Sequence, residues 1–94
     1  MICNFADKET EKIYNGNFSK KLPESIHRIA LRKLMMIDAA NNLNDLRVPP
    51  ANHLERLGGN RAGQYSIRIN KEYRICFFVK KQSIFINVEI VNYH

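Results

Sequence analysis

Two arginines on either side of a short polar turn are the residues of this sequence best suited to bind a phosphate group. Arg68 ends one alternating run and Arg74 lies in the next, with the turn Asn70-Lys71-Glu72 between them. Because the two arginines share strand parity, we expect their side chains on the same face of a hairpin. A guanidinium is costly to bury without a partner, so we expect both side chains to point outward.

Two neighbouring cations repel one another unless an anion lies between them. Glu89, in the following apolar run, could supply a carboxylate and form a structural ion pair. A phosphate from a bound ligand could fill the same place, because the planar guanidinium matches phosphate geometry. The sequence alone leaves both interpretations open.

The last residues of the chain, Asn92-Tyr93-His94, follow directly on an apolar strand pattern. A terminal histidine can be incidental, but its unperturbed pKa near neutrality lets it both accept and donate a proton. With a tyrosine beside it and arginines on the neighbouring strands, it becomes a candidate catalytic group. These residue types suit RNA cleavage, in which the 2′-hydroxyl attacks and the protein stabilises a charged phosphorane and protonates the leaving oxygen.

Metal and nucleotide-binding signatures are missing from the sequence. His27, His53 and His94 lack ligand spacing, and no cluster of cysteines or carboxylates accompanies them, so no metal or other cofactor is expected. The pair Gly58-Gly59 is followed by Asn60-Arg61 rather than by a lysine that opens a helix, which excludes a P-loop.

The net charge of +6 is concentrated in the second half of the chain. Residues 1–46 carry seven Lys or Arg against six Asp or Glu, and residues 47–94 carry eight against three. Five of those eight basic residues are arginines. This distribution favours a surface that binds a polyanion, nucleic acid by default, over a basic surface that serves only solubility. The candidate RNA-binding residues of this half are Arg47, His53, Arg56, Arg61 and Arg68.

The 94 residues are enough for one domain, 1–94. No apolar run approaches the ~18 residues that span a bilayer, so no membrane association is expected. The N-terminus lacks the basic segment and long apolar stretch of a signal peptide, which favours the cytoplasm. Cys3 and Cys76 are therefore expected as reduced thiols rather than as a disulfide.

The elements that must position these residues can be read from the pattern of apolar side chains. Residues 2–5 predict a short first strand, and residues 8–15 a first helix with Asp7 as its N-cap and Gly16 as its stop. Pro23 fits the start of a longer second helix, which the asparagines at 41, 42 and 44 end. Its apolar stripe consists of Ile26, Ile29, Ala30, Leu34, Ile37 and Ala40.

A segment with little periodicity, residues 45–63, separates these helices from the rest of the chain. Its prolines and glycines predict a long loop, and loops of this length are usually functional or disordered. His53, Glu55, Arg56 and Arg61 lie in it, and apolar anchors such as Leu57 indicate that it is ordered. Three alternating runs follow, residues 65–69, 73–79 and 83–91, and predict an antiparallel meander.

The order strand, helix, helix, loop and three strands (β-α-α-β-β-β) predicts an α+β fold. Two helices are expected to pack on one face of an antiparallel sheet of about four strands. The covered face should hold Ile67, Ile69, Ile75 and Phe77, and the open face Ser66, Arg68, Arg74 and Glu89.

Three segments carry a resemblance to a known family. They are Leu57-Gly58-Gly59-Asn60-Arg61-Ala62-Gly63-Gln64-Tyr65-Ser66-Ile67-Arg68, Tyr73-Arg74-Ile75-Cys76-Phe77, and Val88-Glu89-Ile90-Val91-Asn92-Tyr93-His94. In their order across the whole chain they resemble the HigB branch of the RelE toxin superfamily, and in particular the plasmid-maintenance killer proteins that include GraT-type toxins.

This resemblance implies a small RelE-like fold and a toxin of a type II toxin–antitoxin system. The expected activity is a ribosome-dependent endoribonuclease that cleaves messenger RNA in the A site and so inhibits translation. The expected reaction is metal-independent attack by the 2′-hydroxyl, giving a 2′,3′-cyclic phosphate. The expected partners are the ribosome, messenger RNA and a helix-turn-helix antitoxin of the HigA or GraA type, in a complex that binds operator DNA.

The resemblance also implies catalytic roles for Arg74 and for the tail residues Asn92, Tyr93 and His94. This chain departs from the family pattern at Asn92, where an acidic residue is expected, and at Glu55, where relatives place a histidine. Gly58 stands at a position that relatives fill with lysine. One hypothesis makes Glu55 the general base and His94 the general acid. The alternatives are a protein that binds RNA or ribosomes and blocks translation without cleavage, or a basic face that serves only to bind the antitoxin.

Overall fold

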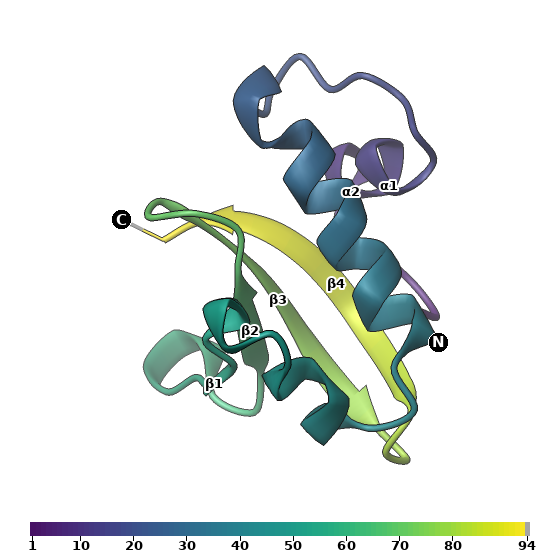
Figure 1. Cartoon of the computed structure of the whole chain (residues 1–94), viewed down its shortest axis with the longest axis vertical. Coiled ribbons are helices and arrows are strands. Elements are labelled where there is room, and N and C mark those ends of the chain that lie inside the picture. Colours follow the sequence, from purple (N-terminus) through teal and green to yellow (C-terminus); the bar gives the residue numbers. More distant parts are fainter. Residues whose placement is uncertain (94) are drawn as a thin grey trace.

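The computed structural model describes residues 1–93, which form two helices packed on a four-stranded antiparallel sheet (Figure 1). This confirms the predicted α+β fold class. The helices are α1 (Lys8–Tyr14) and α2 (Glu24–Ala39), and three short 3-10 helices follow, η1 (Leu43–Arg47), η2 (Pro50–Asn52) and η3 (Gly59–Arg61). The strands are β1 (Glu55–Arg56), β2 (Tyr65–Arg68), β3 (Tyr73–Lys80) and β4 (Ile84–Asn92), in the spatial order β1-β2-β3-β4.

Both helices form where their end signals predict them. The Asp7 side chain accepts a hydrogen bond from the Thr10 backbone N–H at 3.0 Å and so caps α1, and Gly16 follows that helix with a φ of +80°. In α2 the predicted apolar stripe is turned to the sheet, with Ala30, Leu34 and Ile37 fully buried. The long helix therefore supplies most of the helical side of the core.

The side of the sheet that faces α2 is the one that strand alternation predicts. Ile67, Ile75 and Phe77 are fully buried and Ile69 nearly so, in one cluster with the residues of the α2 stripe. Phe77 also packs edge-on against Phe85 of β4, with ring centroids 5.5 Å apart. The prediction for the covered face is thus confirmed.

The first residues of the chain do not form the predicted strand. Ile2 and Phe5 make isolated parallel bridges to Phe85 and Val88, so the N-terminal segment lies along the outer edge of β4 (Figure 1). Between those two partners Asn87 adopts a φ of +52°, a left-handed conformation that interrupts the regular ladder. The fourth strand of the sheet is instead β1, which lies within the predicted loop.

A carboxylate of α2 fixes this N-terminal segment. Asp38 accepts hydrogen bonds from the Ile2 backbone N–H at 2.8 Å and from the Tyr14 hydroxyl at 3.0 Å. The bond to Asp38 raises the pKa of the Tyr14 hydroxyl above its ordinary value. One side chain thereby joins the start of the chain, α1 and α2.

The segment 45–63 is ordered by a polar contact that the sequence did not reveal. Asn52 is fully buried, and its side-chain amide donates to the Leu46 carbonyl at 3.1 Å while its oxygen accepts from Lys33 of α2. Only 6% of Lys33 is exposed, and burial lowers the pKa of its ammonium group. Asn52 therefore fastens the 3-10 turns to the long helix.

None of the helices within residues 1–93 combines the length and the apolar character that crossing a membrane requires.

The edge of β4 gives a direct test of this packing. The backbone N–H of Ile90 donates to the hydroxyl of the fully buried Thr10 at 2.9 Å. Thr10→Val conserves volume but leaves that donor unpaired, so we expect it to lower the free energy of unfolding by about 1–3 kcal/mol.

Thr10→Ser keeps the hydroxyl and removes one methyl group, which should cost only about 0.8 kcal/mol. Urea unfolding of the three proteins provides the measurement. If the valine variant is the more stable of the two, the hydrogen bond to Ile90 is not what holds α1 to this edge.

Candidate functional site

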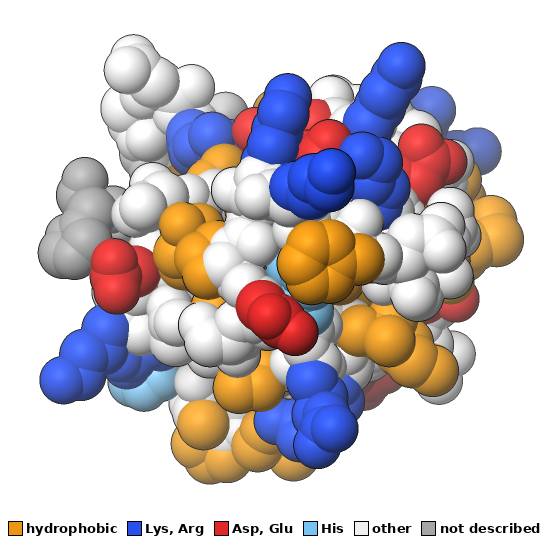
Figure 2. Space-filling model, turned by 90° about the horizontal axis from the view of Figure 1, so that it is seen from above, with side chains coloured by type: hydrophobic (Ala, Val, Ile, Leu, Met, Phe, Trp, Pro, Cys, Tyr) orange, Lys and Arg blue, Asp and Glu red, His pale blue; other side chains and the backbone are white. Residues whose placement is uncertain are grey.

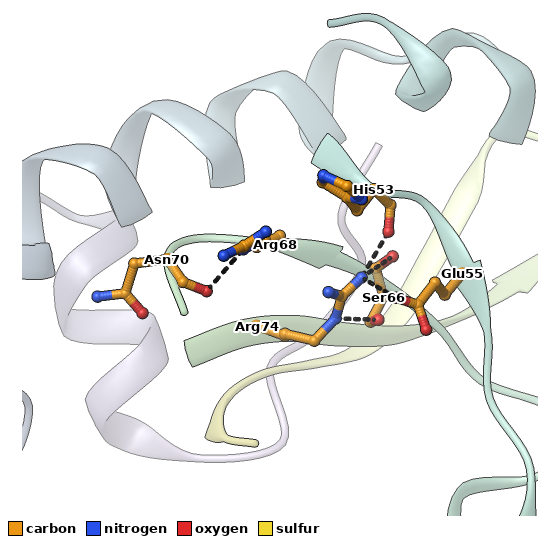
Figure 3. Close-up of polar contacts among 6 residues, drawn as sticks. All are labelled: His53, Glu55, Ser66, Arg68, Asn70 and Arg74. Atoms are coloured by element: carbon orange, nitrogen blue, oxygen red, sulfur yellow. Dashed lines mark hydrogen bonds and ion pairs between the residues drawn. The ribbon is translucent and has the colours of Figure 1, made fainter. Parts of the chain in front are cut away.

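Arg74 of β3 is the centre of the polar cluster on the sheet face opposite α2 (Figure 3). Its Nε donates to the Ser66 hydroxyl at 2.7 Å, and its Nη2 donates to the His53 carbonyl at 2.5 Å. Nη2 also lies 3.4 Å from a carboxylate oxygen of Glu55. The hydrogen bonds among residues 1–93 thus engage Nε and Nη2, and Nη1 makes none of them.

The expectation that Arg74 points into solvent is wrong, because only 8% of the residue is exposed. The segment before β2 folds over this part of the sheet and brings oxygen acceptors to the guanidinium. Hydrogen bonds and one carboxylate offset the cost of desolvating the cation. The arginine is therefore held in a defined orientation before any ligand arrives.

Local backbone geometry explains how the His53 carbonyl reaches Arg74. His53 directly follows η2 and has a φ of +44°, in the left-handed region that a non-glycine residue seldom adopts. Its neighbour Asn52 is anchored in the core, so the turn cannot relax without losing buried hydrogen bonds. The strained residue and the buried amide together aim one carbonyl at the guanidinium.

Glu55 of β1 is the carboxylate that faces Arg74. The short strand pairs with β2 so that Glu55 lies opposite Ser66, the residue that binds Nε of Arg74. Its side chain remains 54% exposed. A ligand that approaches Arg74 therefore meets a carboxylate that is open to solvent on its outer side.

Glu89 of β4 does not lie between the two arginines, contrary to the ion-pair interpretation. It pairs with Arg61 at 3.2 Å, and Arg61 also donates to the Gln64 side chain at 3.0 Å. Arg68 directs its Nε to the Asn70 carbonyl at 3.1 Å, away from Arg74 (Figure 3). Each arginine of this face thus has its own oxygen acceptors.

The end of β4 brings one of the tail residues to Arg74. The Tyr93 ring centre is 5.8 Å from Cζ of Arg74, within the range of a cation–π contact, and 45% of the residue is exposed. Asn92 pairs with Tyr73, so strand alternation directs its side chain to the opposite face from Arg74. His94 lies outside the described residues.

The remaining candidate residues are distributed around this centre. Arg56 is exposed next to Glu55 on β1, and Arg47 is exposed on η1, where its Nε donates to the Asn44 side chain at 3.1 Å. The structure therefore brings Arg74, Glu55 and Tyr93 together, with the main chain of His53. It does not gather all the predicted RNA-binding residues at one point.

Cys76 follows Arg74 by two residues on β3, so its side chain lies on the same face of the sheet, where it is fully buried. Burial raises the pKa of its thiol above the ordinary value; the charges of Arg61 and Arg74 act in the opposite direction, and that of Glu89 adds to the increase. Cys3 is exposed, and both thiols are free, as the sequence indicates. Across residues 1–93 there is no group of three or more His, Cys, Asp or Glu side chains placed to hold a metal ion.

Sequence reasoning missed the groups that fix Arg74. Strand parity placed Ser66 on the correct face but gave no sign that its hydroxyl binds a guanidinium. His53 was a candidate for its imidazole, whereas its carbonyl makes the contact. The sequence did contain one signal for a partner of Arg74: Glu55 is the only acidic residue of the otherwise basic segment 47–71.

Comparisons with known proteins agree on one family. Residues 3–94 match the family described as the RelE-like toxin of type II toxin-antitoxin system HigB. Toxin HigB-1 of Vibrio cholerae is 45% identical over 78 residues, which cover 82% of each chain. An uncharacterized protein of Haemophilus influenzae is 44% identical over 75 residues, which cover 79% of this chain and 74% of that protein.

A solved structure agrees in fold. A chain of the heterotetrameric YoeB–YefM toxin–antitoxin complex from Staphylococcus aureus superposes with a TM-score of 0.60 at 21% identity. The superposition covers 100% of this chain and 95% of that one. This likeness in fold supports the expected RelE-like architecture.

The burial of Cys76 can be measured by thiol modification. In Cys3→Ser, the remaining thiol should react with a disulfide reagent at pH ~8 at least about 100-fold more slowly than a free thiol, because it is inaccessible and its raised pKa leaves less thiolate. The matched variant Cys76→Ser retains the exposed Cys3 and should react rapidly. Rapid reaction of both variants in the folded state would show that Cys76 is not buried.

Proposed function

The chain belongs to the HigB-like toxins of the RelE family and is a toxin of a type II toxin–antitoxin system; from this premise we propose that it is an endoribonuclease that cleaves messenger RNA in the ribosomal A site. Cleavage there would inhibit translation. The observation that carries this function is the buried guanidinium of Arg74, fixed by oxygen acceptors at Nε and Nη2 while Nη1 makes no hydrogen bond among residues 1–93.

The proposed reaction consumes only the RNA, because the nucleophile is its own 2′-hydroxyl group. The ribose 2′-oxygen bonds to the adjacent phosphorus, the bond from phosphorus to the 5′-oxygen breaks, and the products are a 2′,3′-cyclic phosphate and a 5′-hydroxyl. One proton leaves the 2′-hydroxyl and one reaches the departing oxygen. Arg74 would stabilise the extra negative charge of the phosphorane, and it is already oriented, so little reorganisation accompanies the step.

Glu55 is our candidate for the base that takes the 2′-hydroxyl proton. Its carboxylate is half exposed and lies 3.4 Å from Arg74, so a phosphate bound to the guanidinium would sit beside it. His94 follows Tyr93 in the sequence and is our candidate for the acid. The Tyr93 ring would flank the bound phosphate. Asn92, whose side chain is directed to the other face, would help to position the C-terminal residues and would not contact the reacting atoms.

RNA binding would extend from this centre over the basic half of the chain. On the segment that carries Glu55, Arg56 is exposed and Arg61 is half-exposed. His53 and Arg68 lie together at another part of the surface. Arg47 would contact RNA from η1. Family membership also implies a cognate antitoxin; we propose a helix-turn-helix protein whose complex with this toxin binds operator DNA, with ribosome and messenger RNA as the cytoplasmic targets.

A second candidate function is favoured by the contact between Glu55 and Arg74. In the free protein this ion pair partly neutralises the guanidinium, and the Asn92 side chain offers no carboxylate. A chain whose base is engaged in this way could bind RNA on the ribosome and block translation without cleaving it. A blocker creates no new RNA ends, so mapping transcript ends after induction separates the two functions.

Substitution of Arg74 tests the proposed centre. Arg74→Ala should lower the rate of cleavage of ribosome-bound messenger RNA by about 10²–10³-fold, because one preorganised donor to the phosphorane is lost. The measurement is single-turnover cleavage with mapped ends, together with growth arrest after induction.

Arg28→Ala serves as the matched control, since Arg28 is an exposed arginine of α2 that lines a different pocket, together with Phe18 and His27. Circular dichroism establishes that both variants are folded. Cleavage at the parent rate by the Arg74 variant would place the reaction elsewhere.

Substitution of Glu55 separates the base from a structural partner of Arg74. If Glu55 takes the proton, Glu55→Gln should lower the single-turnover rate by about 10²–10⁴-fold while RNA binding is kept or improved. If Glu55 only neutralises Arg74, the rate should stay within about twofold of the parent. Glu72→Gln, an exposed carboxylate in the β2–β3 turn, is the control and should leave both quantities unchanged.

A further inference from the structure

A groove of about 410 Å³ lies between α2 and the turn that joins β2 to β3. Four cationic side chains line it, Arg32 and Lys33 of α2, Arg68 at the end of β2 and Lys71 in the turn, and His53 lies at its border. No acidic residue is among the residues that line it. The groove is thus a concave and strongly positive surface beside the Arg74 centre.

These four cations have no carboxylate partner within residues 1–93. The ion pairs of that part of the chain join Lys12 to Glu9, Arg61 to Glu89 and Arg74 to Glu55. The groove cations instead use uncharged oxygens: Lys33 donates to Asn52, and Arg68 donates to the Asn70 carbonyl. No anion within residues 1–93 pairs with them to relieve their mutual repulsion, and a bound anion would relieve it.

Lys33 makes this a built site rather than a chance grouping of surface charges. Only 6% of the residue is exposed, and its ammonium is fixed by an asparagine that is itself fully buried. By contrast, the face formed by the α1–α2 connection carries acidic and basic side chains next to one another (Figure 2). There Lys12 and Lys21 act on the carboxylate of Glu9, so the charges are largely balanced.

The groove and the Arg74 centre share one residue, His53. Arg68 and Arg74 are directly opposite one another in the β2–β3 ladder, so their Cβ atoms are about 5 Å apart although their guanidinium groups diverge (Figure 3). His53 joins the two places, because its carbonyl binds Arg74 while the residue lines the groove. A polyanionic chain with one phosphate at Arg74 would therefore present its next phosphate to the groove.

We propose that this groove binds the RNA phosphate adjacent to the scissile one, through Arg68, Lys71, Arg32 and Lys33. This inference rests on the proposed function in assigning RNA as the ligand, and it adds the direction in which the strand leaves the Arg74 centre. RNA fits better than an acidic peptide because the two anion positions follow one another along the sheet, as successive phosphates of a single strand do.

The test uses a short single-stranded RNA whose 2′-hydroxyls are all methylated, so that it cannot be cleaved. Its binding to the intact protein is followed by fluorescence anisotropy over a range of salt concentrations. The double variant Arg68→Gln/Lys71→Gln should bind at least about tenfold more weakly at ~0.1 M salt. It should also lower the slope of log affinity against log salt by about 1.4, or 0.7 for each lost phosphate contact.

The matched control is Lys20→Gln/Lys21→Gln, which removes the same charge from exposed positions in the α1–α2 connection. It should remain within about twofold of the parent. Equal losses in both double variants would show that only net charge matters, and no loss in the groove variant would show that RNA does not enter the groove; either result overturns the inference. Arg32→Gln, on the exposed side of α2, repeats the measurement should the double variant unfold.

A competing acidic polypeptide tests whether RNA is the ligand. Tighter binding of polyglutamate than of RNA, with the same dependence on Arg68 and Lys71, would identify an acidic protein segment as the ligand and would overturn the RNA assignment. Failure of the nuclease function is seen separately, because this assay contains no ribosome and no cleavable bond. Loss of cleavage in Arg74→Ala with an unchanged groove effect keeps the two conclusions independent.

Discussion

A guanidinium group removed from water must find oxygen atoms in the protein, and the arrangement of this molecule around Arg74 follows from that requirement. The acceptors come from three different elements: Ser66 from β2, Glu55 from β1 and the carbonyl of His53 from the end of η2. No two of these could be brought to the arginine unless the segment between α2 and β2 folds back over the sheet. The ordered conformation of that segment and the orientation of Arg74 therefore depend on the same hydrogen bonds.

The segment is held from its other end by the long helix. Lys33 and Asn52 are a buried polar pair inside an otherwise apolar contact between α2 and the 3-10 turns. Such a pair adds little net stability compared with apolar side chains, but it tolerates few alternative packings. In this fold it fixes the position of His53, the next residue, and through that carbonyl it fixes Arg74.

Local patterns in the sequence were enough to predict the helices, the meander and the face on which Ile67, Ile75 and Phe77 lie. Those features depend on periodicity and on capping residues close by in the chain. Parity also placed Ser66 and Arg74 on a common face. It could not reveal that this second face is covered too, because the cover comes from residues about twenty positions upstream that have no periodicity of their own. The two-residue strand β1 was missed for the same reason. The predicted strand over residues 2–5 is reduced to two isolated bridges, on either side of the left-handed Asn87.

The N-terminal segment that lies along β4 limits how another protein can attach to this sheet. Exposed edge strands offer unpaired backbone groups to which a partner can add a strand of its own. Here the backbone of Cys3 and Ala6 donates to β4, and that of Phe85 and Val88 donates back to the N-terminal segment, so this edge is already hydrogen-bonded. The opposite edge is β1, which is two residues long. Main-chain augmentation has little room at either border, and a macromolecule that recognises this toxin must do so chiefly through side chains, by shape and by charge.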